Sequence, residues 1–255
     1  MSTIDLYKKS MLPIDYDVNT GKLIPREDIT IDESGVRMLS DMDDLFKNLK
    51  KDFTDRPLYY MYNGVCLKEH AELFKKHKLR YEYTMILPDT IKGEYIKTHG
   101  HIHYAKADHE KGMMESFEVL YGHGYFLLFT LEEDGCNVVI VYAKVGDKFI
   151  IPKEYYHLTI NSGTEPFIFG DIISLGTAGD YSLLKEKHGA PIYVFKDKCG
   201  APRFEWNDNN YPPIKEMLYC TAETLPWEIS LPNDGPLYTS FISQPHNYDF
   251  LNEAY

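Results

Sequence analysis

The stretch Glu115-Ser-Phe-Glu-Val-Leu-Tyr-Gly-His-Gly124 begins the part of the chain that decides the fold. It is a run of strand-forming residues that ends in a glycine turn, and residues 125–131 read as the strand that returns from this turn to form a hairpin. Asp134-Gly135 marks the next turn. Short apolar runs continue, separated by Gly, Asp, Asn and Pro, at residues 137–143, 148–152, 157–161 and 166–173. This regular succession predicts an all-β sandwich or a small barrel.

Two histidines separated by one residue precede this stretch, in the run Thr98-His-Gly-His-Ile-His103. Side chains at positions i and i+2 of a strand point to the same face, so His101 and His103 are expected to direct two imidazoles to one point. Glu115 and His157, from neighbouring predicted strands, would complete a set of three nitrogens and one oxygen. Such a set suits Fe(II), Mn(II), Ni(II), Cu(II) or Zn(II) and leaves positions open for a substrate or water. The sequence therefore predicts a site for one divalent metal ion.

Simpler interpretations exist for these residues. A His-x-His pair alone is more often two surface or hydrogen-bonded strand histidines than a pair of ligands. Glu118 is the rival of Glu115, but in a regular strand it points to the opposite face. His99, His109 and His123 lack a comparable context, and we expect them at the surface.

The order of these residues resembles the cupin superfamily, whose fold is a small jelly-roll barrel. The first cupin motif is matched at His101, His103, Glu115 and Gly122. The second is matched at Gly146, Pro152, His157 and Asn161. Tyr95 and Glu154 stand where the motifs have glycine, and the gap between His103 and Glu115 is longer than usual. The resemblance implies a mainly β chain, a cupin jelly-roll barrel with a few short N-terminal helices.

A narrower resemblance is to the cupin-type (archaeal-type) glucose-6-phosphate isomerases. Their signature is similar to Thr84-x-x-x-Pro88, Glu94 and Thr98-x-Gly100-His101-x-His103, although Lys92 stands where the family has glycine. Residues 35–42, 165–169 and 180–181 also look like that family. The resemblance covers roughly residues 14–211, and the insertion 104–114 and the tail 212–255 fall outside it.

This resemblance implies an aldose–ketose isomerase that interconverts glucose 6-phosphate and fructose 6-phosphate. It implies that Thr84, Thr98 and the backbone of Gly100 hold the phosphate and that Tyr181 closes the sugar pocket. The family often has a histidine shortly before that tyrosine, and residues 177–180 have none. The family also suggests a homodimer.

The chemistry of the reaction assigns roles within the predicted site. A metal bound to both substrate oxygens stabilises the enediolate as a Lewis acid. Glu115 is the candidate catalytic base that moves a proton between C2 and C1. A metal-assisted hydride shift needs no strong base, and the sequence does not choose between the two routes. Iron is the preferred ion, with manganese, nickel and zinc as alternatives.

Three other functions remain open from the sequence. The first is an isomerase or epimerase of another sugar phosphate, such as mannose 6-phosphate. The second is a cupin Fe(II) dioxygenase, and the third is a non-catalytic sugar-binding or storage module. The threonines and glycine before His101 favour a sugar-phosphate isomerase over the dioxygenase.

Composition sets broader limits. The chain has 255 residues and a formal net charge of −12, which argues against nucleic acid and anionic membrane partners. Lys92 and Lys97 are expected to make the field near a bound sugar phosphate more positive. No apolar run approaches a membrane span, and the N-terminus has no signal-peptide pattern. The four cysteines are scattered, so reduced thiols in a cytoplasmic protein are expected, with two disulfides as the alternative.

The remaining chain is expected to form one structural domain in three parts. Residues 1–79 pack on the barrel, residues 80–211 form the barrel with the metal site, and residues 212–255 are a C-terminal extension. Residues 40–51 and 67–77 are predicted as helices, 58–63 as a strand, and 191–195 with 202–206 as a late hairpin. The extension has no long helical or strand period, and we expect an aromatic strap over the barrel or a cover for a dimer interface. The insertion 104–114 is either a lid, with His109 near the pocket, or a longer hairpin loop.

Overall fold

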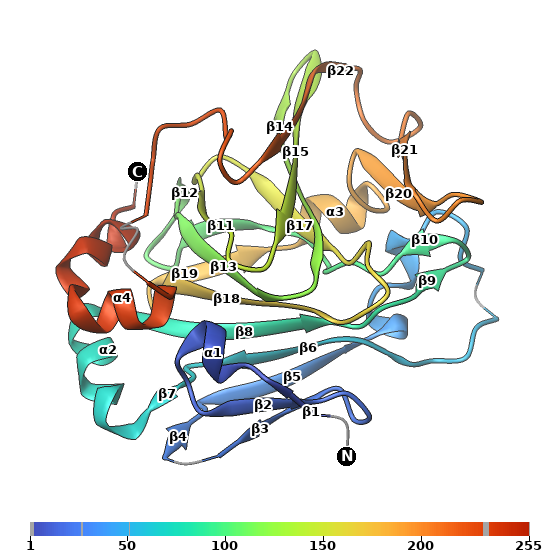
Figure 1. Cartoon of the computed structure of the whole chain (residues 1–255). Helices are drawn as coiled ribbons and strands as arrows, with labels where there is room; N and C mark the ends of the chain where they lie inside the picture. Colours follow the sequence, from blue (N-terminus) through green and yellow to red (C-terminus); the bar gives the residue numbers. More distant parts are fainter. Residues whose placement is uncertain (1–2, 27, 51, 232–234, 255) are drawn as a thin grey trace.

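Two facing β-sheets form the centre of the molecule (Figure 1). The computed structural model describes residues 3–26, 28–50, 52–231 and 235–254. The larger sheet has the order β16-β13-β18-β8-β6-β5, formed by Lys148–Ile151, Glu115–Tyr121, Phe167–Ser174, Leu79–Ile86, Pro57–Asn63 and Glu33–Met38. The smaller sheet has the order β17-β14-β15-β22, formed by Tyr156–Ile160, His123–Glu132, Gly135–Lys144 and Ile214–Thr221.

Aromatic side chains from both sheets fill the space between them. Phe126 of β14 lies with its ring centroid 5.2 Å from that of Phe117 in β13 and 4.8 Å from that of Phe149 in β16. All three side chains are buried. Alternate residues of each strand therefore point into one apolar core, as expected for two packed sheets. The mainly β, cupin-like barrel predicted from the sequence is confirmed.

The predicted hairpin after Glu115 is wrong. β13 pairs with β16 and β18, whereas β14 pairs with β15 and β17, so Gly122 carries the chain from one sheet to the other. Its φ of +74° favours glycine, and a Cβ there would lie 2.4 Å from the carbonyl oxygen of Pro166. A glycine turn alone does not show whether the next strand returns or crosses. The turn at Asp134 does form a hairpin, in which Glu132 lies opposite Gly135.

The predicted helix at residues 40–51 is also wrong. The segment forms two 3-10 turns, η1 (Leu39–Asp41) and η2 (Asp43–Leu45). The backbone N–H and the hydroxyl of Ser40 both donate to Asp55, at 2.9 and 2.8 Å, so Ser40 does not cap a helix. Lys51, at the end of the predicted helix, lies outside the described residues.

The other predicted elements are present. The helix at 67–77 appears as η3 (Lys68–His70) and α2 (Ala71–His77), and the strand at 58–63 lies within β6. The late hairpin is formed by β20 (Ile192–Lys196) and β21 (Pro202–Trp206). The insertion is a longer hairpin, with β11 (Ile102–Ala105) paired to β12 (Asp108–Gly112) on one side and to β19 (Thr177–Asp180) on the other.

Shorter elements complete the chain. At its N-terminal end these are β1 (Thr3–Asp5), α1 (Tyr7–Ser10), β2 (Ile14–Asp17), β3 (Lys22–Pro25), β4 (Ile29–Thr30) and β7 (Cys66–Leu67). Beside the barrel lie β9 (Thr90–Ile91), β10 (Glu94–Tyr95) and α3 (Ser182–Glu186). None of the helices in the described residues is long and apolar enough to cross a membrane. All four cysteines are free.

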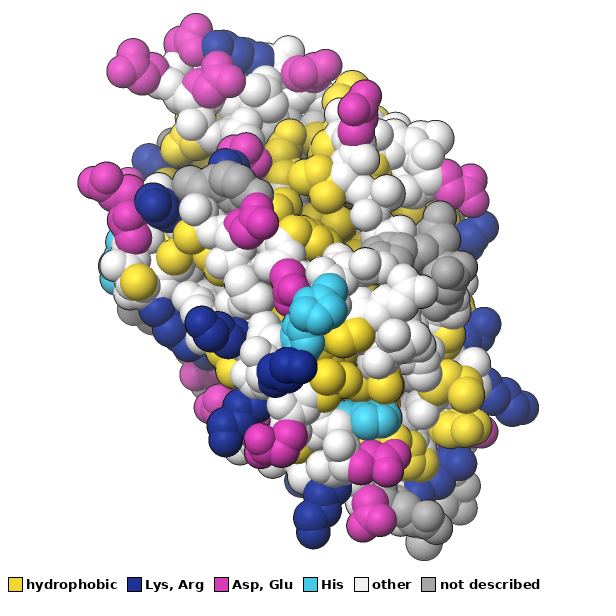
Figure 2. Space-filling view, turned by 90° about the vertical axis from the view of Figure 1, so that its left-hand side faces the viewer, with side chains coloured by type: hydrophobic (Ala, Val, Ile, Leu, Met, Phe, Trp, Pro, Cys, Tyr) yellow, Lys and Arg dark blue, Asp and Glu magenta, His cyan; other side chains and the backbone are white. Residues whose placement is uncertain are grey.

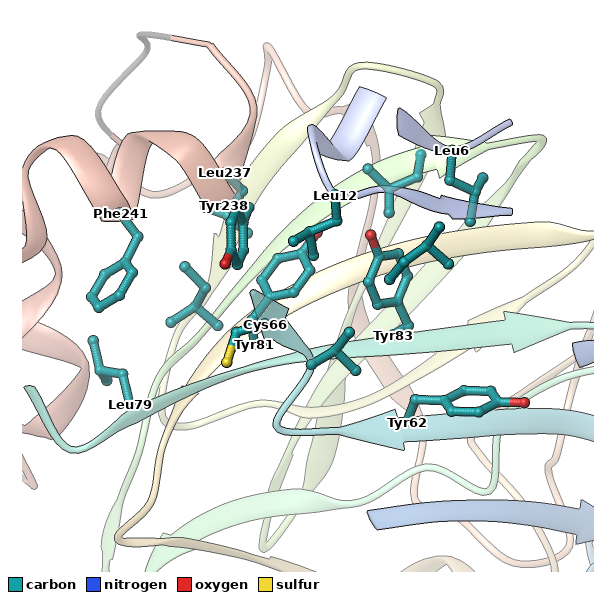
Figure 3. Close-up of a cluster of buried hydrophobic side chains, with 14 of the residues drawn as sticks. Leu6, Leu12, Tyr62, Cys66, Leu79, Tyr81, Tyr83, Leu237, Tyr238 and Phe241 are labelled. Atoms are coloured by element: carbon teal, nitrogen blue, oxygen red, sulfur yellow. The ribbon is translucent and has the colours of Figure 1, made fainter. Parts of the chain in front are cut away.

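The C-terminal extension is more regular than its sequence predicts. It adds β22 parallel to β15, and then forms α4 (Leu237–Ser243) and η4 (Pro245–Asn252). α4 lies over the outer face of the larger sheet, where its residues join a second buried cluster (Figure 3). In that cluster Tyr81 of β8 lies with its ring centroid 5.3 Å from that of Tyr238. Both faces of the larger sheet are therefore covered, which explains why β13 is buried along six consecutive residues.

Candidate metal centre and active site

The four residues predicted as metal ligands come together at one point inside the barrel. His101 precedes β11 and pairs with His157 of β17: each backbone N–H donates to the other residue's carbonyl oxygen, at 3.0 and 2.8 Å. His103 lies in β11 and Glu115 begins β13. One potential ligand atom from each of the four lies within 4.8 Å of the others. The two-residue spacing thus directs both imidazoles to one face, as the sequence predicts.

The potential ligand atoms of the four residues lie close to one another. The Nε2 atoms of His101 and His103 are 2.5 Å apart. Oε2 of Glu115 lies 3.3 Å from Nε2 of His157 and 3.6 Å from Nδ1 of His103. The carboxylate therefore faces imidazoles that come from two other strands.

Burial controls the charge of these groups. It lowers the pKa of His157 to about 4 and lowers the pKa values of His101 and His103 well below their usual range. These imidazoles are therefore neutral near pH 7 and can offer lone pairs. Burial and the neighbouring Glu82 raise the pKa of Glu115 to about 8.

The donor set fits a divalent metal ion. Oε2 of Glu115 and Nδ1 of His103 are buried without a hydrogen-bond partner in the described residues, so hydrogen bonds within the protein do not explain their position. A cation among these atoms would give the carboxylate a charge partner and favour its ionised form. Three imidazole nitrogens and one carboxylate oxygen suit several first-row metals.

A cavity of about 180 Å³ opens from this group. A single water needs about 10–15 Å³ by a comparable measure, so a much larger molecule can enter. Thr84, Thr98 and Tyr181, which the sequence predicts as substrate contacts, line it with all four predicted ligands. The backbone N–H of Thr159 donates to Oγ1 of Thr98 at 2.9 Å, which leaves the hydroxyl proton of Thr98 available.

Gly100 lies beside the cavity rather than among the residues described as lining it. Its φ is +80°, and a Cβ there would lie 2.5 Å from Cδ2 of Leu184 and 3.1 Å from Cβ of Leu158. Glycine is therefore required to hold the backbone between His99 and His101 in this conformation.

The predicted position of His99 at the surface is wrong. It is buried and lines the cavity, whereas the sequence predicts a surface residue. Its ring centroid lies 4.9 Å from that of Tyr181, and its Nδ1 lies 3.1 Å from the carbonyl oxygen of Gly100. Burial lowers its pKa. His109 and His123 are exposed, as predicted, and His109 stacks on Tyr104 away from the cavity.

Three charged residues that line the cavity are not among the site residues predicted from the sequence. Arg80, Glu82 and Asp171 lie on β8 and β18, and Asp171 is directly opposite Glu82 in the sheet. Burial, together with Glu115 and Glu82, raises the pKa of Asp171 well above its usual range. Each of the three stands between apolar residues in the sequence. This alternation could have indicated that one face of these two strands is polar.

The prediction that Lys92 and Lys97 act near the cavity is wrong. Lys97 is buried elsewhere, where it contacts Glu94 and donates to the carbonyl oxygen of Leu45 at 2.7 Å. Lys92 is exposed and is not among the cavity residues. Arg80 is the cationic side chain among the described lining residues.

Glu118 points away from the metal group, as the alternation along β13 predicts. Its carboxylate accepts a hydrogen bond from the backbone N–H of Leu237 at 2.7 Å, at the start of α4. Glu118 therefore helps to dock the extension, and Glu115 is the carboxylate of β13 that lines the cavity.

Comparison with known proteins agrees with this geometry. Residues 32–212 match the model of a family described as glucose-6-phosphate isomerase (GPI). Curated relatives named glucose-6-phosphate isomerase include one from Pyrococcus furiosus, 29% identical over 64% of this chain and 81% of its own. Others come from Thermococcus gammatolerans, 30% identical over 62% of this chain and 79% of its own, and Thermococcus kodakarensis, 28% identical over 74% and 92%.

Similarity to solved structures is weak. Vicilin from hazelnut superposes on 48% of this chain and 32% of its own with a TM-score of 0.36 and 10% identity. A superposition at this level has no bearing on the fold or the function.

Proposed function

The chain belongs to the glucose-6-phosphate isomerase family of enzymes, and we propose that it interconverts glucose 6-phosphate and fructose 6-phosphate with one bound divalent metal ion. His101, His103, Glu115 and His157 would hold the ion. The observation that carries this proposal is the convergence of these four donors, three of them buried and His101 partly buried, at a cavity with room for a small molecule. Family membership supports the substrate pair, and the donor set supports the need for metal.

In the proposed reaction of glucose 6-phosphate, the protein positions the open-chain sugar, one proton moves from C2 to C1, and the hydroxyl proton on O2 moves to O1. When bound, the metal ion supplies Lewis acidity that stabilises negative charge on the substrate oxygens. Glu115 accepts the proton from C2 and returns it to C1. The buried walls exclude bulk water, which keeps that proton from exchanging freely. A hydride shift between the two carbons remains the alternative route, and it does not require Glu115 as a base.

The threonines would bind the phosphate end. Oγ1 of Thr98 accepts a hydrogen bond from the backbone N–H of Thr159, so the hydroxyl proton of Thr98 can be donated to a phosphate oxygen. Thr84 lines the same cavity, and the backbone at Gly100 lies beside it. Tyr181, 4.9 Å from the ring of His101, would close over the sugar. Iron as the native metal, a homodimer, a cytoplasmic location and a role in glycolysis and gluconeogenesis remain predictions.

The deciding experiment is a coupled assay of fructose 6-phosphate conversion. Purified protein is treated with a chelator, and Fe(II), Mn(II), Ni(II) or Zn(II) is then added back. We expect turnover to disappear with the chelator and to return with at least one metal. Full turnover in the metal-free protein would refute the metal role, and no turnover with any metal would refute the substrate assignment. A panel that includes mannose 6-phosphate would then identify another sugar phosphate.

A ligand variant tests the metal site separately. His157→Ala removes one imidazole, so we expect metal content and turnover to fall together. His123→Ala removes an exposed histidine from β14 and is the matched control, with both quantities unchanged. Full metal content in His157→Ala would exclude His157 as a ligand.

A further inference from the structure

A second group of potential metal ligands lies outside the barrel, where α2 meets the C-terminal extension. It consists of His77, the last residue of α2, and of His246 and Asp249 in η4. Nδ1 of His77 lies 2.8 Å from Oδ1 of Asp249, and Nδ1 of His246 lies 2.9 Å from Oδ2 of the same carboxylate. One potential ligand atom from each residue lies within 4.8 Å of the others. The carboxylate thus lies between two imidazoles.

The 3-10 geometry of η4 explains this arrangement. Because a 3-10 helix has three residues per turn, side chains at i and i+3 lie in one row. Tyr248 and Leu251 form a buried row that joins the apolar cluster beneath α4. His246, Asp249 and Asn252 form the next row, which faces α2. The apolar row of η4 therefore packs against the buried cluster, and its polar row places potential metal ligands beside α2.

Hydrogen bonds hold this second row against α2. The side-chain amide of Asn252 donates to the carbonyl oxygen of His77 at 2.9 Å, and this carbonyl lies in the last turn of the helix. The hydroxyl of Ser174 donates to Oδ1 of Asn252 at 2.7 Å. The position of the three donors is therefore fixed by contacts other than those among themselves.

Hydrogen bonding leaves the group incompletely satisfied. Carboxylate oxygens only accept, so each histidine donates from Nδ1. Nε2 of His77 is then buried without a partner in the described residues, and the His77 side chain is only 4% exposed. A buried nitrogen without a partner is unfavourable, and an ion bound by Nδ1 would not change that, so the case for an ion rests on the convergence of the three donors.

The outer side of the group is open to solvent. The side chain of His246 is 79% exposed and that of Asp249 is 48% exposed. Figure 2 shows the face that carries α2 and α4, where histidine and acidic side chains lie together near its centre. Water can therefore complete the coordination of an ion bound from this side.

We propose that His77, His246 and Asp249 form a second metal site, for Zn(II) or a similar divalent transition metal, that fastens the C-terminal extension to α2. Two imidazole nitrogens and a carboxylate oxygen, completed by water, are donors that Zn(II), Co(II), Ni(II) and Cu(II) accept. Two of the three ligands lie beyond residue 212, outside the part of the chain that matches the family model. This site is independent of the reaction. Because only the folded extension brings the three donors together, a bound ion stabilises the docked form.

The test is a Zn(II) titration of the full-length protein after chelator treatment, with the bound metal counted per chain. We expect two equivalents for the wild type and one for His246→Ala or Asp249→Asn. His123→Ala, which removes an exposed histidine elsewhere, is expected to keep two. The double variant His101→Ala/His103→Ala, which leaves the cavity only two of its four donors, should keep one equivalent, and the same protein with His246→Ala added should bind none. Equal amounts of bound Zn(II) in the wild type and in His246→Ala would overturn the proposal.

A second readout separates this site from the cavity. In the His101→Ala/His103→Ala background, Zn(II) should raise the melting temperature and slow proteolysis within the extension. The same addition should have neither effect when His246→Ala is also present. If Zn(II) leaves both quantities unchanged in the His101→Ala/His103→Ala protein, the three residues form a hydrogen-bonded cluster only. None of these outcomes depends on isomerase turnover, and if the cavity binds no metal, the wild type still binds one equivalent that is lost in His246→Ala.

Discussion

Glu115 lies in a row of acidic side chains on the cavity side of the larger sheet. Asp171 and Glu82 are its neighbours across β18 and β8, and Arg80 contacts Glu82. Burial raises the pKa values of all three carboxyl groups. Negative charge in this row is therefore costly without a cation. The residue proposed as the base is thus the one whose ionised form depends most on the metal.

Glu115→Gln tests the base role directly. The amide keeps the shape of the side chain but cannot accept the C2 proton, so we expect kcat to fall by about 10²–10⁴-fold. Three imidazoles remain, so the cavity should still bind about one metal ion per chain at saturating metal. Both quantities are measured on the same preparation.

The matched control for this prediction is Glu118→Gln. It makes the same change three residues along β13, on the opposite face of the strand, and we expect kcat to stay within about twofold of the wild type. If Glu115→Gln keeps full turnover with metal bound, the proton route is wrong and a hydride shift is favoured.

At the scale of single residues, the sequence predicts ligands better than it predicts their surroundings. His101, His103, Glu115 and His157 could be identified because strand alternation and motif order are local properties. His99 could not, because its burial depends on strands that are distant in the sequence. Lys97 was misplaced for a similar reason: besides the nearby Glu94, its amine contacts the carbonyl oxygen of Leu45, on a segment far from it in the chain.

At the scale of elements, Gly122 decides where the chain changes sheets. Gly122→Ala adds the strain of a left-handed residue, about 1–2 kcal/mol, and a clash with the carbonyl oxygen of Pro166. Gly146 also has positive φ, at +95°, but no atom lies within 4 Å of its Cβ position. We therefore expect Gly122→Ala to lower the unfolding free energy more than Gly146→Ala, as measured by urea denaturation. Equal losses would mean that the Pro166 segment moves aside without cost.

The contact between β13 and α4 is expected to depend on pH. Burial raises the pKa of Glu118 from the ordinary 4.5 to about 7. Between these values the folded protein keeps a proton that the unfolded chain releases, so this contribution to stability is present below pH 4.5 and lost as pH rises through 7. The full shift corresponds to roughly 3 kcal/mol.

Glu118→Gln removes this dependence while an amide oxygen can still accept the N–H of Leu237. We expect the variant to be more stable than the wild type at pH 8 and similar to it at pH 5, as measured by chemical denaturation. Glu216→Gln, an exposed change on β22, should alter neither value by more than about 0.5 kcal/mol. A variant that loses stability at both pH values would show that the Glu118 carboxylate is ionised when folded.

The wrongly predicted elements share one cause. The segment after Ser40 has a good helical pattern, but its leucines and Phe46 are buried against the barrel and its serine is bound to Asp55. The run after Gly122 has a good hairpin pattern, but its partners are β15 and β17. In both cases contacts distant in sequence override a local preference.

At the scale of the whole molecule, the extension completes the structure rather than wrapping loosely around it. Phe241 of α4 is fully buried and stacks on Phe74 of α2, with ring centroids 4.3 Å apart. Phe241→Ala should therefore lower the unfolding free energy by about 3–5 kcal/mol. Tyr219→Ala, at a side chain 57% exposed on β22, should change it by less than about 1 kcal/mol. Equal small effects would show that the cluster under α4 contributes little to stability.

The parallel pairing of β22 with β15 has a consequence for biosynthesis. β15 ends at Lys144 and β22 begins at Ile214. The edge of β15 that pairs with β22 therefore stays unpaired until roughly 70 more residues have been synthesised. At about 5–20 residues per second, a ribosome needs roughly 4–14 s to supply it. During that interval the nascent chain exposes an unpaired edge, and the part of the larger sheet's apolar outer face that α4 covers stays exposed until α4 follows. The emerging polypeptide therefore passes through a stage at which chaperones have a defined surface to protect.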